Sequence, residues 1–182
     1  MKNKDVLIAA ALLAGKEDAA AYFSGKQPLN AETAKLDAEF LAFALKLALM
    51  EISERKRAPE YEERVTSNGF VSYQSLTKRP MKILTVNGEK TKPSASVEGF
   101  SAPVGEITVK YRYFPEGGME GELDLPQGVN PNAVVLYIAA ECAARDRMQD
   151  RAEYLSAKYE RALFSTAGNA KGSLLPERGW QA

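Results

Sequence analysis

The sequence predicts an α+β fold that is mainly α: a helical bundle with a small antiparallel β-sheet inserted between a long helix and a C-terminal helical hairpin, plus an extended C-terminal tail. Three observations predict it. Apolar residues recur at helical spacing near both ends, residues 61–115 carry Asn-Gly turns and two-residue alternation, and residues 168–182 have a linker-like composition. A chain of 182 residues with 45% apolar content can bury the core of one ordinary domain.

We expect residues 1–167 to form that single domain, followed by the tail 168–182. The parts of the domain, in chain order, are a helical region 1–58, a β insertion 61–115, an acidic loop 116–129 and a helical hairpin 130–167.

The start of the chain, "MKNKDVLIAAALLAGKEDAAAYF", has the basic and apolar regions of a secretory signal. However, Asp5 interrupts the junction between them, and charges at 16–18 precede any cleavage point. We therefore favour a helix over 5–14, capped by Asp5 and ended by Gly15, with a second helix over 17–24; a cleaved signal is the alternative. No apolar run approaches the roughly 20 residues of a membrane span, so we expect no membrane contact.

A long helix is predicted over 31–57, with Asn30 as its N-cap. Its apolar residues cover much of the circumference; they are Leu36, Phe40, Leu41, Phe43, Leu45, Leu47, Ala48, Met50 and Ile52. Such a helix is either buried centrally or packed between subunits. The basic cluster that ends it, "ERKRAP", suits a solvated helix C-terminus better than a nucleic-acid patch.

The β insertion has two Asn-Gly turns, Asn68-Gly69 and Asn87-Gly88, and each predicts a hairpin. The segment 105–115 alternates apolar and polar residues, so one face should be buried. The expected buried residues are Ile107, Val109, Tyr111 and Tyr113. Tyrosines beside Lys110 and Arg112 could form a base-stacking platform, but an ordinary half-buried strand is the interpretation that we prefer.

The acidic loop contains "EGGMEGELD", whose carboxylates are Glu116, Glu120, Glu122 and Asp124. Their spacing does not fit an EF-hand, and the interspersed glycines do not suit the rigid support that catalysis needs. A solvated turn is therefore expected here, with a structural cation or paired catalytic carboxylates as the lesser alternatives.

Two helices are predicted after the loop. The first covers 130–144, begins at Asn130, and buries a stripe of Val134, Val135, Ile138, Ala139 and Cys142. After a break at 145–151, a seam continues along the second at spacings of three and four, through Met148, Ala152, Leu155, Tyr159 and Ala162.

Composition argues against enzymes and against general nucleic-acid binders. The 24 basic and 24 acidic residues balance, whereas phosphate binding needs an excess of positive charge. With no histidine, the chain lacks the commonest general base and the favoured zinc ligand. The lone Cys142 is expected to be a buried hydrophobe, with a reactive thiol as the alternative. We predict no catalytic residue, cofactor or metal.

The order of elements, together with "KILTVNGEK", "VKYRYFP" and "AEYLSAKYERAL" and the terminal "LPERGW", resembles the head–tail connector proteins (adaptor or head-completion proteins) of tailed bacteriophages. The resemblance implies a structural virion protein of the neck, without enzymatic activity, assembled in the host cytoplasm. Copies would form a ring, dodecameric by analogy, beneath the portal, and would extend the channel through which DNA passes. Other partners would be the portal itself and a head-closure or tail protein.

Two sets of residues become candidate sites under this resemblance. The tail is expected to dock on the portal through Leu174, Leu175, Pro176, Arg178 and Trp180, with folding back onto its own domain as the alternative. The acidic loop is expected to face the channel through Glu116, Glu120, Glu122 and Asp124, where it would repel phosphates. The alternative function is a cellular nucleic-acid- or peptide-binding module that uses the sheet face; a histidine-free hydrolase is a more distant one.

Overall fold

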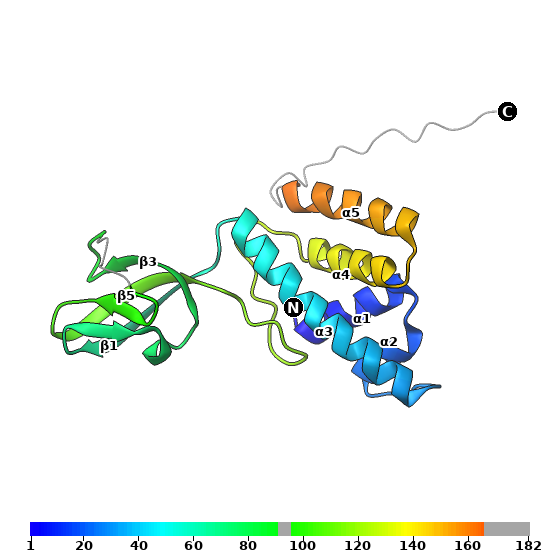
Figure 1. The fold of residues 1–182 in the computed structure, drawn as a ribbon, viewed down its shortest axis with the longest axis horizontal. Helices are drawn as coiled ribbons and strands as arrows, with labels where there is room; N and C mark the ends of the chain where they lie inside the picture. The colour runs from blue at the N-terminus through cyan, green and yellow to red at the C-terminus, as the bar shows by residue number, and fades with distance from the viewer. Residues whose placement is uncertain (91–95, 166–182) are drawn as a thin grey trace.

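The computed structural model describes residues 1–90 and 96–165. Its helices are α1 (Asn3–Ala14), α2 (Glu17–Ser24), α3 (Ala31–Arg55), α4 (Pro131–Arg145) and α5 (Gln149–Phe164). Its strands are β1 (Glu60–Ser67), β2 (Phe70–Ser72), β3 (Pro80–Val86), β4 (Gly99–Ser101) and β5 (Gly105–Tyr113), with a 3₁₀ turn at Tyr73–Ser75. The helices gather at one end and the strands at the other (Figure 1), which confirms the predicted mainly α, α+β class.

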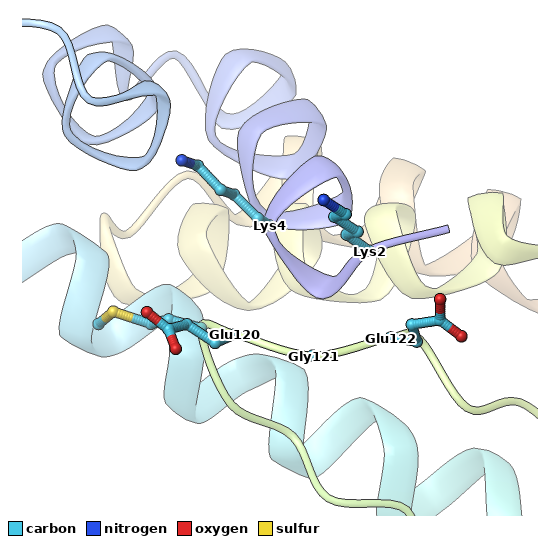
Figure 2. Close-up of a pocket in the computed structure, with 6 residues that line it drawn as sticks. Lys2, Lys4, Glu120, Gly121 and Glu122 are labelled. Carbon is cyan, nitrogen blue, oxygen red and sulfur yellow. The ribbon is translucent and has the colours of Figure 1, made fainter.

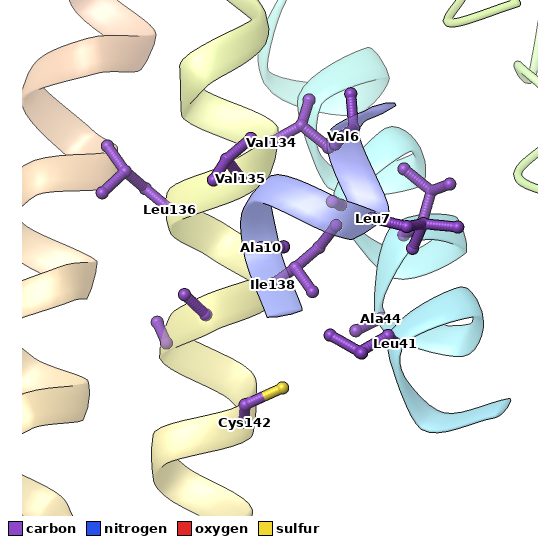
Figure 3. Packing of buried hydrophobic residues seen from close by; sticks show 14 of the residues in the cluster. Val6, Leu7, Ala10, Leu41, Ala44, Val134, Val135, Leu136, Ile138 and Cys142 are labelled. Atoms are coloured by element: carbon purple, nitrogen blue, oxygen red, sulfur yellow. The ribbon is translucent and has the colours of Figure 1, made fainter. Parts of the chain in front are cut away.

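The apolar N-terminal helix α1 forms the centre of the helical core. Figure 3 shows Val6, Leu7 and Ala10 between residues of α4 and α3, and all three are fully buried. Alanine is the most frequent buried residue of this core, and its small side chain allows helix backbones to approach closely. The segment that looks like a signal sequence is therefore an internal packing element of this fold.

The start of α1 differs from the prediction. Asp5 is not the N-cap, because the helix begins two residues earlier, after Lys2. The Asp5 carboxylate instead accepts a hydrogen bond from the Lys2 amide at 3.2 Å, as the third helical residue of a capping box does. Gly15 ends the helix in the left-handed region, and Asn30 caps α3 by accepting from the Thr33 amide at 3.1 Å, both as predicted.

The α4–α5 hairpin closes the bundle. Asn130 caps α4, and the whole predicted α4 stripe is buried. Arg147, at φ 59°, makes the tight break before α5. The seam of α5 is buried at Ala152, Leu155 and Tyr159 but not at its ends, since Met148 is exposed and Leu163 takes the place predicted for Ala162.

Cys142 lies inside this bundle, with 1% of its surface exposed. Burial raises the pKa of its thiol to about 11, so the protein holds it as a neutral hydrophobe, in line with the preferred interpretation.

The strands form a separate core that shares no residue with the helical one. A three-stranded antiparallel sheet has the order β1-β5-β3, with β5 in the centre. The alternation along β5 is confirmed, because Ile107, Val109, Tyr111 and Tyr113 are all buried. The Tyr111 hydroxyl donates to Glu63 and accepts from the Lys78 amide, which ties all three residues together.

The hairpin predicted at Asn68-Gly69 is wrong. β1 pairs with β5, whereas β2 pairs with β4, so the two strands beside this turn belong to different sheets. The reason is burial: the pair Val71–Phe100 brings two buried side chains into the second core, which a β1–β2 hairpin would not do. At Asn87-Gly88 a turn does form, with both residues at positive φ, and Val86 bridges to Glu89.

No helix in residues 1–90 and 96–165 combines the length and apolarity that a membrane span needs.

Candidate functional site

The acidic loop connects β5 to α4 and runs along the helical bundle. Two backbone hydrogen bonds on either side of Glu122 hold the loop against the start of the chain. The Asn3 amide donates to the Gly121 carbonyl at 3.0 Å, and the Leu123 amide donates to the Met1 carbonyl at 2.8 Å. Gly117 lies so close to α3 that a Cβ atom there would sit 2.9 Å from the Lys46 Cα. The predicted solvated turn is therefore anchored on α1 and α3.

The four predicted carboxylates are brought together. They line one groove of about 390 Å³ at the junction between the bundle and the sheet, which we call the acidic groove; its lining is Asn3, Lys78, Glu116, Glu120, Gly121, Glu122, Leu123 and Asp124. The Tyr113 hydroxyl donates to the Asp124 carboxylate. Burial and this carboxylate both raise the pKa of Tyr113, so the phenol stays protonated and keeps the loop attached to β5.

A neighbouring pocket of about 300 Å³ opens between α1 and the same loop. Figure 2 shows Lys2 and Lys4 on its α1 side and Glu120 and Glu122 on the loop side, with Gly121 between them. The lysines partly balance the acids on this side. In the acidic groove itself Lys78 is the one cation among four carboxylates, within the part of the chain that the structure describes.

The chemistry of the groove is electrostatic. Among residues 1–90 and 96–165, no group of three or more acidic, histidine or cysteine side chains has the arrangement of a metal site. The arrangement can repel phosphates or accept a cationic segment, because several carboxylates share one partly enclosed surface.

The outer face of the sheet carries the predicted basic residues, but they are paired. Lys110 and Arg112 both reach Glu60, at 3.0 Å and 3.7 Å. The bonds from Lys110 and Arg57 hold the pKa of Glu60 below its usual value. Tyr111 and Tyr113 lie in the second core rather than on this face, so they are not available for stacking on a base.

A second candidate surface lies on α3. Leu36, Phe43 and Met50 recur every seven residues on its outer side, and they are 61%, 55% and 46% exposed. Phe40 and Leu47 lie between them and are half-buried. We call these five residues the outer stripe. The sequence predicted that the helix is apolar on many sides, and its spacing of 4, 3, 4 and 3 residues could have identified the stripe as a separate seam.

The proposed docking residues of the tail, Leu174, Leu175, Pro176, Arg178 and Trp180, lie outside the described residues. The described part of the chain ends just beyond α5, whose last residue, Phe164, packs beside α3. The Lys56 ammonium lies 4.4 Å from the centre of the Phe164 ring. The described part of the chain therefore ends beside the C-terminal end of α3.

Comparison of the chain with models of known protein families, with curated proteins and with solved structures gave no match.

Proposed function

We propose that this chain is a structural protein of the neck of a tailed-phage virion, which forms a ring below the portal, connects head to tail and extends the DNA channel. The observation that carries the proposal is the outer stripe: a long central helix on which the described residues leave Leu36, Phe43 and Met50 exposed. Large exposed apolar surfaces mark sites of association between proteins. The order of the elements supports it through the resemblance to head–tail connector proteins.

The acidic groove has a role in this proposal. A channel that conducts DNA must not bind it tightly, and Glu116, Glu120, Glu122 and Asp124 would repel phosphates if they faced the bore. The pinning of the loop on α1 and α3 would hold these charges in place as DNA moves past them.

The tail would dock on the portal. Burying Trp180 contributes at most about 3–5 kcal/mol, whereas ordering the chain costs about 1–2 kcal/mol per residue. The apolar residues alone therefore do not hold the tail, and backbone pairing with the portal is needed as well. A ring also helps, because every seated neighbour raises the effective concentration of the next tail.

The test uses two variants in the phage that encodes the chain. Deleting residues 170–182 should leave the melting temperature of the free protein nearly unchanged but yield DNA-filled heads without tails, seen by electron microscopy. Replacing the four acids with glutamine should allow assembly but slow DNA ejection.

The control is Gln181→Ala, which leaves every proposed docking residue in place. A large loss of thermal stability on deletion would instead mean that the tail folds back onto its own domain, and tailed particles from that variant would contradict docking. Unchanged ejection kinetics in the glutamine variant would mean that the acidic groove does not face the channel.

The cellular nucleic-acid- or peptide-binding module remains the alternative. The ion pairs of Lys110 and Arg112 with Glu60 argue against nucleic-acid binding, since they partly neutralise these two cations. A nucleic-acid-binding module should bind oligonucleotides with an affinity that falls steeply as the salt concentration rises, whereas the neck protein should bind DNA weakly at any salt concentration.

A further inference from the structure

The outer stripe has the spacing of a helix-packing seam. Leu36, Phe40, Phe43, Leu47 and Met50 follow one another at intervals of 4, 3, 4 and 3 residues. On the opposite side of α3, Ala38, Leu45 and Ile52 are fully buried in the helical core. The helix thus carries two apolar faces, and the described residues cover one of them completely.

Two opposite charges lie along the same flank of the outer stripe. Glu39 and Lys46 are seven residues apart, so they project from the same side of the helix, and both are exposed. Neither forms an ion pair within residues 1–90 and 96–165, although many other charged residues in the same range are paired. They lie on either side of Phe43, the middle residue of the stripe, four residues before it and three after it.

We propose that the outer stripe of α3 is covered by α3 of a second copy, packed antiparallel about a two-fold axis midway between Phe40 and Phe43. In an antiparallel pair, positions whose numbers have the same sum lie opposite each other. Phe40 then faces Phe43 of the second copy, and Leu36 faces Leu47. Glu39 and Lys46 are not directly opposite, but each flanks the Phe40–Phe43 pair: Glu39 directly precedes Phe40, and Lys46 lies one turn beyond Phe43. The arrangement therefore brings Glu39 near Lys46 of the second copy, twice, so both flanking charges are paired.

This inference does not rest on the proposed virion function. A two-fold contact closes with two copies, whereas a ring needs head-to-tail contacts between different surfaces. If the ring proposal is right, the dimer is the form of the free protein before assembly, with its apolar stripe covered until the portal is available. A cellular protein would use the same dimer permanently.

The experiment measures the mass of the full-length chain by sedimentation over a range of concentrations. The wild type should dimerise reversibly, and Phe43→Glu should remain monomeric. Leu12→Glu is the matched control, because Leu12 is also an exposed apolar helix residue, at 58%, but lies on α1 outside the stripe. Leu12→Glu should dimerise like the wild type.

Charge reversal at two exposed residues tests the orientation. Because Lys46 also lines a pocket with Glu116 and Glu120, the melting temperature of each variant is measured first to show that it folds. E39K and K46E alone should each weaken the dimer by roughly 5- to 30-fold, because two attractive contacts become repulsive. Mixing the two variants should restore wild-type affinity in a heterodimer, and the double variant E39K/K46E should restore it in a homodimer.

A wild type that stays monomeric at high concentration would overturn the proposal, as would a dimer that Phe43→Glu leaves intact. Single reversals that weaken association while neither the mixture nor the double variant restores it would overturn the antiparallel arrangement. A ring that Phe43→Glu and the single reversals each break, and that mixing the two reversals does not restore, would overturn the two-fold pair but leave the proposed neck function standing.

Discussion

At the scale of single residues, charged side chains join the turns at one end of the bundle. Asp37 of α3 is nearly buried and accepts from Arg145 of α4, which also lies over the Phe40 ring at 4.3 Å. Lys16, between α1 and α2, reaches Asp146 at 2.6 Å. These contacts connect four helices at a place where local sequence gives no indication that they meet.

Acid should weaken this fold. Burial opposes ionisation of Asp146, but the bond from Lys16 outweighs it and holds its pKa below the usual value; Arg55 does the same for Glu160. When folding lowers the pKa of a carboxyl group, its ion pair contributes fully to stability at a pH above the pKa of the unfolded state, about 4. This contribution is lost as the pH falls through the pKa of the folded state. We expect the urea midpoint to hold down to about pH 5 and to fall below about pH 4.

Lys16→Met tests one of these pairs. Without the Lys16 ammonium, the folded state lowers the pKa of Asp146 less, so the ionised carboxylate stabilises the fold less. The difference in stability between wild type and Lys16→Met should shrink as the pH falls below about 4. A difference that stays constant with pH would mean that the Lys16–Asp146 pair contributes nothing through ionisation.

Local residue signals predicted the caps well and failed where a distant contact intervenes. Gly15, Asn30 and Asn130 act as predicted, because a helix end needs only its own neighbours. Asp5 is displaced from the N-cap because the helix begins at Asn3, directly after Lys2, which is fixed by a β-bridge to Glu122. That bridge spans most of the chain, and no local pattern reveals it.

At the scale of elements, α1 is predicted to contribute strongly to stability. Leu7→Ala should lower the free energy of unfolding by about 2–5 kcal/mol, because it leaves a cavity among α1, α3 and α4. The matched change Leu12→Ala, at an exposed position of the same helix, should stay within about 0.5 kcal/mol of the wild type. Urea unfolding followed by circular dichroism measures both.

Equal losses from the two substitutions would mean that the burial of α1 seen here is wrong. A null effect for both would mean that α1 is dispensable for folding, as a detachable leader would be.

Element types were easier to predict than their pairing. The alternation on β5 identified each residue of the buried face, because successive side chains of a strand point to opposite faces of the sheet. The partner of β2 was missed because it is β4, far along the chain, and the preference comes from burying Val71 and Phe100 together. The Asn-Gly signal at 68–69 predicted the turn but carried no information on which strands it would join.

At the scale of the whole molecule, the helical and β cores meet at the acidic groove. The four carboxylates are close in sequence, so their gathering could be predicted, whereas Asn3 and Lys78 come from the bundle and from beyond β2. The anchoring of the loop could likewise not be predicted from the sequence, because it depends on how α1 and α3 lie beside the loop. The sequence thus identified the charged residues of this candidate site but not the surface on which they lie.

We propose that this protein acts by being held by other protein subunits. The most direct measurement is the mass, by light scattering, of the full-length chain mixed with its proposed partner, a phage portal protein from the same genome. We predict a single large complex containing many copies of both proteins. The two proteins eluting separately, each at its own mass, would contradict the claim.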